Sequence, residues 1–241
     1  MKIDVLTLFP KMFEGPLTES MLRRAREKKL LEIKIRDIRD FTSDRHKTAD
    51  DSAYGGGGMV LKPEPIFKAV EFLKKQSYVI RRTSYVEGKN RSTLDARRST
   101  VILMTPDGKR FDQQAAKGLA KKKHLIFICG HYEGVDERIR KIADEEISIG
   151  DYVLTGGEIP AMVVIDAVAR MVEGVVGRKD ATARDSFYSG TLDWPHYTRP
   201  RKFRNMKVPD VLFSGNHGKI EEWREKKAFE RTKKRRPDLL K

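Results

Sequence analysis

The sequence Ile149-Gly150-Asp151-Tyr152-Val153-Leu154-Thr155-Gly156-Gly157-Glu158 separates a short apolar run, Glu146 to Ile149, from a long apolar stretch, Ile159 to Val172. The short run is typical of a buried strand, and the long stretch, which is rich in small residues, predicts a buried helix. Pro160 falls in the first turn of that helix, where proline is well tolerated. Loops that follow strands are where ligands bind in open α/β sheets, so this loop is a candidate ligand site.

The same alternation of strand and helix extends back to the start of the chain. Apolar runs rich in Val and Ile predict further strands at Ile3 to Phe9, Leu31 to Ile38, Thr100 to Met104 and Leu125 to Cys129. Helical spacing of apolar residues lies between them, at Thr18 to Lys29, Pro63 to Lys75, Asp112 to Lys122 and Val135 to Ala143. We therefore expect an α/β domain over residues 1–176 with a parallel sheet.

The composition changes after residue 176. Gly177 to Arg184 lacks any apolar period and predicts a flexible linker, and residues 185–241 form a second, small and mostly helical domain. From Arg178 onward there are 18 Lys or Arg against 9 Asp or Glu, a net +9 out of +15 for the whole chain. A helix expected at Lys219 to Arg235 carries many of these charges, either to bind RNA or simply as a solvated face.

The overall charge points to a polyanionic partner. At +15 the field of the protein attracts nucleic acid before any specific contact forms. A lone cysteine, Cys129, cannot form an internal disulfide, and the first apolar run is too short for a signal peptide or a membrane span. We expect a soluble, cytoplasmic protein that does not enter a membrane. The basic stretch Arg81 to Arg98 has weak patterning and predicts a mobile surface insertion.

Three further glycine-containing segments are candidate ligand loops. Asp50 to Gly58 ends in four glycines, which either let backbone amides approach a phosphate or a base, or form a flexible loop. Thr105 to Gly108 and Gly130 to Gly134 each follow a predicted strand. Neither a P-loop nor a Gly-x-Gly-x-x-Gly motif is present, which argues against an NTPase and against a Rossmann-type enzyme.

A polar and aromatic cluster occupies Arg184 to Phe187 and Gly190 to Pro200. It offers carboxylates, an imidazole, a guanidinium and aromatic rings, which are the groups needed to stack a base and move a proton. Asp185 could equally cap a short helix, and His196 could be an ordinary surface histidine.

Several of these segments together resemble one family. The motifs are Asp44-Arg-His-Lys-Thr48, Asp50-Asp51, Tyr54-Gly-Gly-Gly57, Cys129-Gly130, Tyr132 to Arg138, Ile149 to Glu158 and Pro195 to Pro200. In this order they resemble the bacterial tRNA (guanine-N1)-methyltransferases of the SPOUT superfamily, from the first strand to the last helix. The resemblance implies a deep trefoil knot at the end of the α/β domain, which the general rule against knots would not predict.

The resemblance also implies a cofactor and an assembly. S-adenosylmethionine would lie in the knot of one subunit of a homodimer, and the basic C-terminal domain of the other subunit would complete the site that receives tRNA. The residues that match the cofactor loops of the family are Met104, Thr105, Pro106, Gly108, Gly130, Tyr132, Glu133, Ile149, Gly150, Asp151, Tyr152, Val153, Leu154, Gly156, Gly157 and Pro160.

The implied catalytic residues are Asp185, as the base that removes the N1 proton of guanosine 37, and Arg170, as the cation that stabilises charge on O6. The implied substrate residues are Asp193, His196, Arg199, Asp51 and Tyr54. The family also suggests Mg²⁺ dependence, although the sequence has no diagnostic metal spacing and no metal ligand is assigned.

Two features depart from the family pattern. His131 stands where arginine is frequent, and Arg81 to Arg98 is longer than the usual connection. Two other functions stay open at this stage. A non-enzymatic RNA-binding protein would explain the charge but would not need convergent glycine turns, and a SPOUT enzyme acting on ribosomal RNA or on ribose would differ in the modified nucleoside.

Overall fold

The computed structural model describes residues 1–82, 99–177 and 182–240. Contacts divide the chain into two compact units, Met1–Gly177 and Arg178–Lys241. Residues 83–98 of the basic insertion and residues 178–181 of the expected linker lie outside the described residues.

A five-stranded sheet forms the centre of the first unit, and every pair of neighbouring strands in it is parallel. Its strands, in the spatial order β2-β1-β6-β5-β7, are Glu32–Asp37, Lys2–Thr7, His124–Cys129, Ser99–Arg110 and Glu145–Ser148. The predicted strands and the predicted α/β class with a parallel sheet are therefore confirmed. Strands buried on both faces read as continuous apolar runs, and all six residues of β6 are buried.

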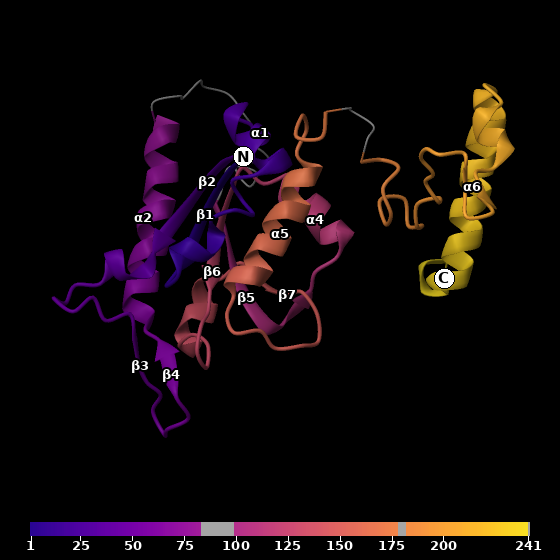
Figure 1. Ribbon diagram of the computed structural model, residues 1–241. Coiled ribbons are helices and arrows are strands. Elements are labelled where there is room, and N and C mark those ends of the chain that lie inside the picture. The colour runs from indigo at the N-terminus through magenta and orange to yellow at the C-terminus, as the bar shows by residue number, and fades with distance from the viewer. Residues whose placement is uncertain (83–98, 178–181, 241) are drawn as a thin grey trace. The chain divides into compact units, whose positions relative to one another are not determined.

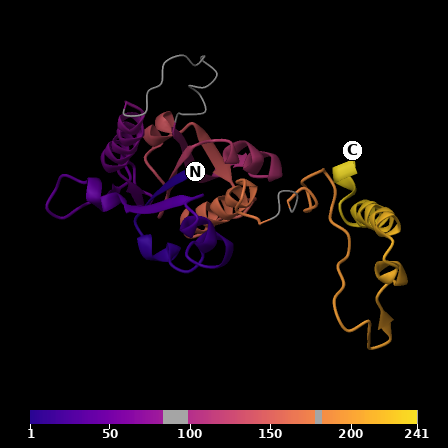
Figure 2. The same cartoon turned by 90° about the horizontal axis from the view of Figure 1, so that it is seen from above.

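Helices cover both faces of the sheet (Figures 1 and 2). The helices α1, α4 and α5, which are Ser20–Glu27, Gln113–Ala120 and Glu158–Met171, pack on one face in a cluster that includes Phe13 and Phe127. On the other face, α2 (Pro63–Arg82) packs with the short 3₁₀ helices η2 (Ile38–Phe41) and η3 (Glu137–Ile142). A third short helix, η1 (Pro10–Phe13), follows β1.

Three local predictions need correction. The helix expected at Val135 to Ala143 is the 3₁₀ helix η3, because Asp136 accepts a hydrogen bond from the backbone N of Arg138 at 2.9 Å and so favours a tight local turn. The turn expected at Thr105 to Gly108 lies within β5, which continues to Arg110 across a shift in its pairing with β7. The glycine loop is the tip of a small antiparallel hairpin, made of β3 (Asp50–Ser52) and β4 (Met59–Leu61).

The second unit contains one long helix among its described residues 182–240. This helix, α6, spans His217–Arg235 and begins where the Asn216 side chain accepts a hydrogen bond from the backbone N of Lys219 at 3.1 Å. The other elements are short: β8 (Lys202–Phe203), β9 (Met206–Lys207), and the 3₁₀ helices η4 (Asp210–Phe213) and η5 (Pro237–Leu240).

A buried polar network joins four strands at the amino end of the sheet. The Asp4 carboxylate in β1 is fully buried and accepts from Arg36 Nε in β2 at 3.0 Å and pairs with His124 Nε2 in β6 at 2.9 Å. The other nitrogen of the His124 ring lies 2.8 Å from Ser99 Oγ in β5. The Asp4, His124 and Ser99 side chains are buried, and no residue of the network belongs to a glycine loop, so we assign the network to stability.

Burial by itself would raise the pKa of Asp4, but hydrogen bonds from His124 and Arg36 and the charge of Lys2 outweigh it and lower the pKa to about 2. A lowered pKa stabilises the folded state above the unfolded pKa of about 3.9, and this stability is lost as the pH falls toward 2.

We therefore expect Asp4→Asn to lower the free energy of unfolding by about 2 kcal/mol at neutral pH. The difference from wild type should shrink as the pH falls from about 4 toward 2, because the wild-type carboxylate is then also neutral. Urea denaturation followed by circular dichroism at several pH values measures this. A difference that stays constant across that range would show that the charge of Asp4 is not what stabilises the sheet.

Candidate functional site

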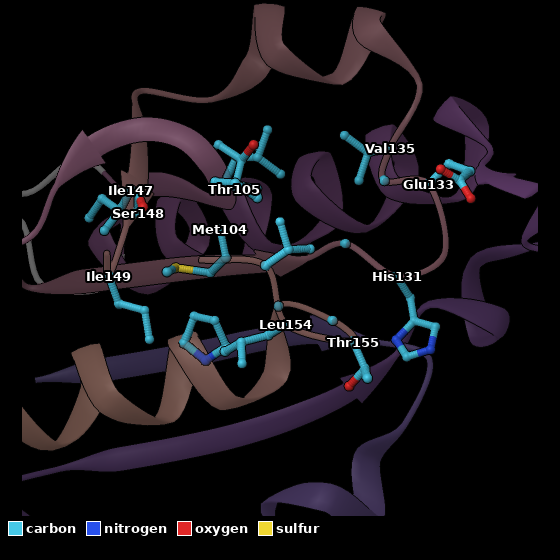
Figure 3. Close-up of a pocket in the computed structure, with 18 of the residues that line it drawn as sticks. Met104, Thr105, His131, Glu133, Val135, Ile147, Ser148, Ile149, Leu154 and Thr155 are labelled. Atoms are coloured by element: carbon cyan, nitrogen blue, oxygen red, sulfur yellow. The ribbon is translucent and has the colours of Figure 1, made fainter. Parts of the chain in front are cut away.

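A cavity of about 380 Å³ lies where the loops after β6 and β7 meet the bulge of β5. Because carboxyl ends of neighbouring parallel strands lie at one edge of a sheet, the three segments converge although they are distant in the chain. Figure 3 shows Met104 and Leu154 in the middle of the cavity, with Ile149 toward one end and His131 and Glu133 toward the other.

All but two of the residues expected to bind the cofactor line this cavity. The exceptions are Gly108 and Asp151. Gly108 lies against the β7 backbone, where a side chain would come within 2.6 Å of Glu146 C, so its role there is close strand packing. The cavity is also lined by residues of the same loops that sequence reasoning did not select, namely Leu103, His131, Gly134, Val135, Glu137, Arg140, Ile147, Ser148 and Thr155.

Gly157 brings the loop after β7 against the end of β6. Its backbone N donates to Gly130 O at 2.7 Å, and a Cβ at this position would stand 2.8 Å from Cys129 Cα. Cβ atoms do not approach backbone atoms this closely, so only glycine lets the two loops touch. A bridge between His131 and Gly156 continues the contact. The double glycine therefore shapes the floor of the cavity.

Arg140, in η3, forms ion pairs that connect this helix to the bulge of β5. Its guanidinium bonds to Asp107 Oδ2 at 2.8 Å, in the bulge of β5, and it also pairs with Glu137 and Glu146. Hydrogen bonds from Thr105 and Arg140 lower the pKa of Asp107, so this carboxylate stays ionised at neutral pH. The charged contacts therefore hold the β5 bulge beside η3.

The β3–β4 hairpin contacts the loop after β6 through its backbone. Glu133 N donates to Met59 O and Leu61 N donates to Gly134 O, both at 3.1 Å. Figure 1 shows the hairpin extending away from the sheet. Asp51 and Tyr54, which we expected on the substrate side, are exposed on this hairpin and do not line the cavity. The hairpin is thus attached to the cavity wall while its tip stays open to solvent.

The remaining expected site residues are spread over both units. Arg170 lies in the last turn of α5 in the first unit. In the second unit, Asp185 is half-buried in a turn, where its backbone N donates to Thr182 O and its carbonyl accepts from Tyr188 N, both at 3.2 Å. His196 Nε2 lies 2.7 Å from Asp193 Oδ2, and Arg199 is exposed nearby in the chain.

Trp194 is surrounded by cationic groups. The guanidinium carbons of Arg224 and Arg184 lie 4.9 Å and 5.9 Å from its ring centroid, and the ring of His196 lies at 5.4 Å. Arg184 belongs to the polar and aromatic cluster selected from the sequence, whereas Arg224 comes from α6, so only the structure shows that both guanidinium groups lie at this ring. Cations around an indole are typical of surfaces that stack bases and contact phosphates.

The described residues contain neither a metal-binding cluster nor a helix that could span a membrane. Within residues 1–82, 99–177 and 182–240, no group of three or more His, Cys, Asp or Glu side chains is placed to hold a metal ion. In the same residues, no helix is both long and apolar enough to cross a membrane.

Comparison with known proteins identifies the family. The sequence pattern described as tRNA (Guanine-1)-methyltransferase TrmD matches residues 1–241. The chain belongs to the tRNA (guanine-1)-methyltransferase TrmD family. Proteins named tRNA (guanine-N(1)-)-methyltransferase from Dictyoglomus turgidum and Endomicrobium trichonymphae are 54% and 55% identical to it. The alignments cover the whole of this chain and 90% and 100% of the relatives. A relative of the same name from Anoxybacillus flavithermus is 55% identical, with 91% of it covered.

For a TrmD family member, the contact at Gly157 should control cofactor binding. We expect Gly157→Ala to weaken S-adenosylmethionine binding at least tenfold, because the new methyl group must push the loop away from Cys129, and to cost roughly 1–3 kcal/mol of stability. Isothermal titration calorimetry and thermal melting measure the two effects. Gly118→Ala in α4 is the matched control, since nothing lies within 4 Å of its Cβ position. Equal cofactor affinity in both variants would contradict a role for the close contact.

Proposed function

We propose that this protein transfers the methyl group of S-adenosylmethionine to N1 of guanosine 37 in tRNA, beside the anticodon. The observation that carries the proposal is the one cavity formed by the ends of β5, β6 and β7, in a chain that matches its family over residues 1–241. Since the substrate is tRNA, we also propose that the protein works in the cytoplasm.

The chemistry of the cavity fits the proposed cofactor. A volume of about 380 Å³ is within the usual range of small-molecule pockets. Apolar side chains such as Met104, Ile149 and Leu154 suit an adenine ring, and the glycine-rich turns expose backbone donors and acceptors for its polar edge and for ribose. When bound, the sulfonium supplies an activated methyl group, so the protein has to bind it and prepare the guanine.

Asp185 is the proposed base. Neutral guanine carries a proton on N1, and a carboxylate within about 3 Å can accept this proton as the methyl group arrives. The turn from Thr182 to Tyr188 holds Asp185 through backbone hydrogen bonds at both of its peptide groups. These hydrogen bonds hold the backbone of Asp185 within its own turn, which supports a carboxylate in a defined orientation.

Arg170 is the proposed electrostatic partner. Loss of the N1 proton leaves negative charge on O6 of guanine, and a fixed guanidinium stabilises this charge in the transition state. Arg170 belongs to the last turn of α5, the helix that begins at the cavity floor beside Gly157. A rigid helix therefore joins the proposed cation to the cofactor loop.

The proposed tRNA-binding surface lies on the second unit and on the β3–β4 hairpin. Asp193, His196 and Arg199 form one wall, and Trp194 with its two arginines adds a stacking and phosphate-binding surface. Asp51 and Tyr54 at the exposed hairpin would contact the substrate from the first unit.

We further propose that the chain forms a deep trefoil knot and a homodimer whose active site is shared between subunits. For the knot, the support is the return of the segment after β7 to pair with the loop after β6 at Gly130 and His131. For the dimer, it is an exposed apolar group around the start of α5: Val153 is 82% exposed, and Tyr152, Ile159 and Val163 are about half exposed. A second copy of the chain would cover this surface.

The decisive experiment is methyl transfer from labelled S-adenosylmethionine to unmodified tRNA transcripts that carry guanosine or adenosine at position 37, followed by nucleoside analysis. We expect 1-methylguanosine only with guanosine at that position. RNA binding without methyl transfer would refute the enzymatic function. Mg²⁺ dependence, which only the resemblance suggests, is tested by adding EDTA and then titrating Mg²⁺ in the same assay.

Replacing the proposed base should separate chemistry from binding. We expect Asp185→Asn to lower kcat by a factor of roughly 10² or more, because the amide cannot accept the proton, while cofactor affinity stays at the wild-type value. Single-turnover kinetics and calorimetry provide the two measurements. Asp210→Asn, at an exposed carboxylate of the same unit, is the control. Wild-type turnover in Asp185→Asn would remove this residue from the mechanism.

Mixing two inactive variants tests the shared site. Asp185→Asn and Arg170→Ala homodimers should each be nearly inactive, but random reassociation makes half of the dimers mixed, with one intact site each if the two residues come from different subunits. Activity should then recover to about one quarter of wild type, by the statistics of a symmetric dimer. If the two residues act within one subunit, mixing will restore nothing.

A further inference from the structure

Glu158 is a buried carboxylate that the proposed mechanism does not use. It is the first residue of α5 and has 0% exposure. One carboxylate oxygen, Oε1, accepts a hydrogen bond of 2.7 Å from Thr7 Oγ1 at the end of β1. A buried carboxylate is costly unless its oxygens are satisfied, so the surroundings of the second oxygen decide what this residue does.

The second oxygen faces His131. Glu158 Oε2 lies 3.7 Å from His131 Nδ1, and each of these two buried atoms has no hydrogen-bond partner among the described residues. Among the described carboxylates, only that of Glu158 lies within ion-pair distance of the His131 ring, so Oε2 is the acceptor available to a proton on Nδ1.

The Glu158–His131 pair contacts three segments: the residues just after β1, the loop after β6 and the loop after β7, of which the last two line the cavity. His131 lines the cavity in the loop after β6, and its ring packs 4.5 Å from the ring of Phe9, just after β1. Phe9 N in turn donates to Thr7 Oγ1 at 2.9 Å, the same hydroxyl that bonds Glu158. Gly156 covers the pair so closely that a side chain there would collide with both Glu158 Oε2 and His131 Nδ1.

The other groups facing Glu158 suit a negative charge on it. The amino end of α5 carries partial positive charge, which stabilises an anion in the first turn. Burial, together with the charge of Glu158, raises the pKa of the Cys129 thiol well above its ordinary value, so Cys129 stays neutral. His131 is the one basic side chain that the described residues place within ion-pair distance of this carboxylate.

We infer that Glu158 is a positioning residue of the cofactor cavity. Its carboxylate holds the His131 ring, and through it the loop Gly130 to Gly134, against the turn at Gly156 and Gly157. The inference rests on the proposed function, because it assigns what sets the affinity of that cavity for S-adenosylmethionine. The Glu158 side chain does not itself line the cavity; it faces His131, which does.

The test variant is Glu158→Gln, which keeps the shape and the acceptor for Thr7 but removes the charge. We expect the Kd and the KM for S-adenosylmethionine to rise about tenfold, since the His131 loop loses its anchor, while kcat and the affinity for tRNA stay within twofold of wild type. The melting temperature should stay the same or rise, because a buried charge is removed. A merely structural carboxylate would instead lower the melting temperature and leave the KM unaltered.

Pairing is tested with His131→Gln and with the double variant. If Glu158 acts through His131, the double variant should lose no more cofactor affinity than either single variant, whereas independent effects would multiply. Asp166→Asn, at an exposed carboxylate of the same helix, is the control and should bind as wild type does. If Glu158→Gln does not fold, His131→Gln, at a side chain that is 19% exposed, still measures the effect on the loop.

The possible failures are distinguishable. If the wild-type protein does not bind S-adenosylmethionine, the proposed function fails. If wild type binds and Glu158→Gln binds equally well, or if the losses in the double variant multiply, the positioning role of Glu158 is refuted while the proposed function stands.

Discussion

The backbone contact between Gly157 and the end of β6 is the constraint on which the rest of the first unit depends. It lets α5 start directly beneath the loop after β6, so that its buried residues Ala161, Val164 and Val168 pack on the sheet. The same contact brings the loop after β7 under the bulge of β5. This close backbone contact, which requires glycine at position 157, therefore links the position of α5 to the shape of the cavity.

Much of this arrangement is predictable from the sequence because it follows from periodicity. Val101 to Met104 of β5 and Leu125 to Cys129 of β6 are continuous apolar runs, as expected for strands covered on both faces, and α5 is mostly apolar from Ile159 onward. The edge strand β2 instead alternates isoleucine with charged residues. The spatial order of the strands cannot be predicted from the periodicity of apolar residues. In the sheet β5 lies between β6 and β7, and no local sequence pattern indicates this order. The β3–β4 hairpin was missed because its strands have three residues each and include Asp50 and Asp51, which are poor strand formers.

The candidate site can also be predicted only in part from the sequence. The loops that line the cavity can be predicted, because glycine-rich turns after parallel strands converge on one edge of the sheet. Gly108 matches a cofactor loop of the family, whereas in the structure it lies against the β7 backbone and is not among the residues that line the cavity. Glu158 has no signal at all, since a carboxylate at the start of a helix is ordinary and only the neighbouring Thr7 and His131 show that it is buried and paired. The roles of Asp185 and Arg170 come from the family resemblance, because an Asp-Ser pair alone equally starts a helix.

One end of the sheet holds a stabilising polar network and the other end holds the cavity, and this separation has an evolutionary consequence. The network of Asp4, Arg36, His124 and Ser99 ties four strands at the amino end, whereas the cavity occupies the carboxyl end. Substitutions in the network change how tightly the strands are held together without entering the cavity wall. Lineages that move to hotter or colder habitats can therefore retune the rigidity of this enzyme at one end while selection preserves cofactor recognition at the other.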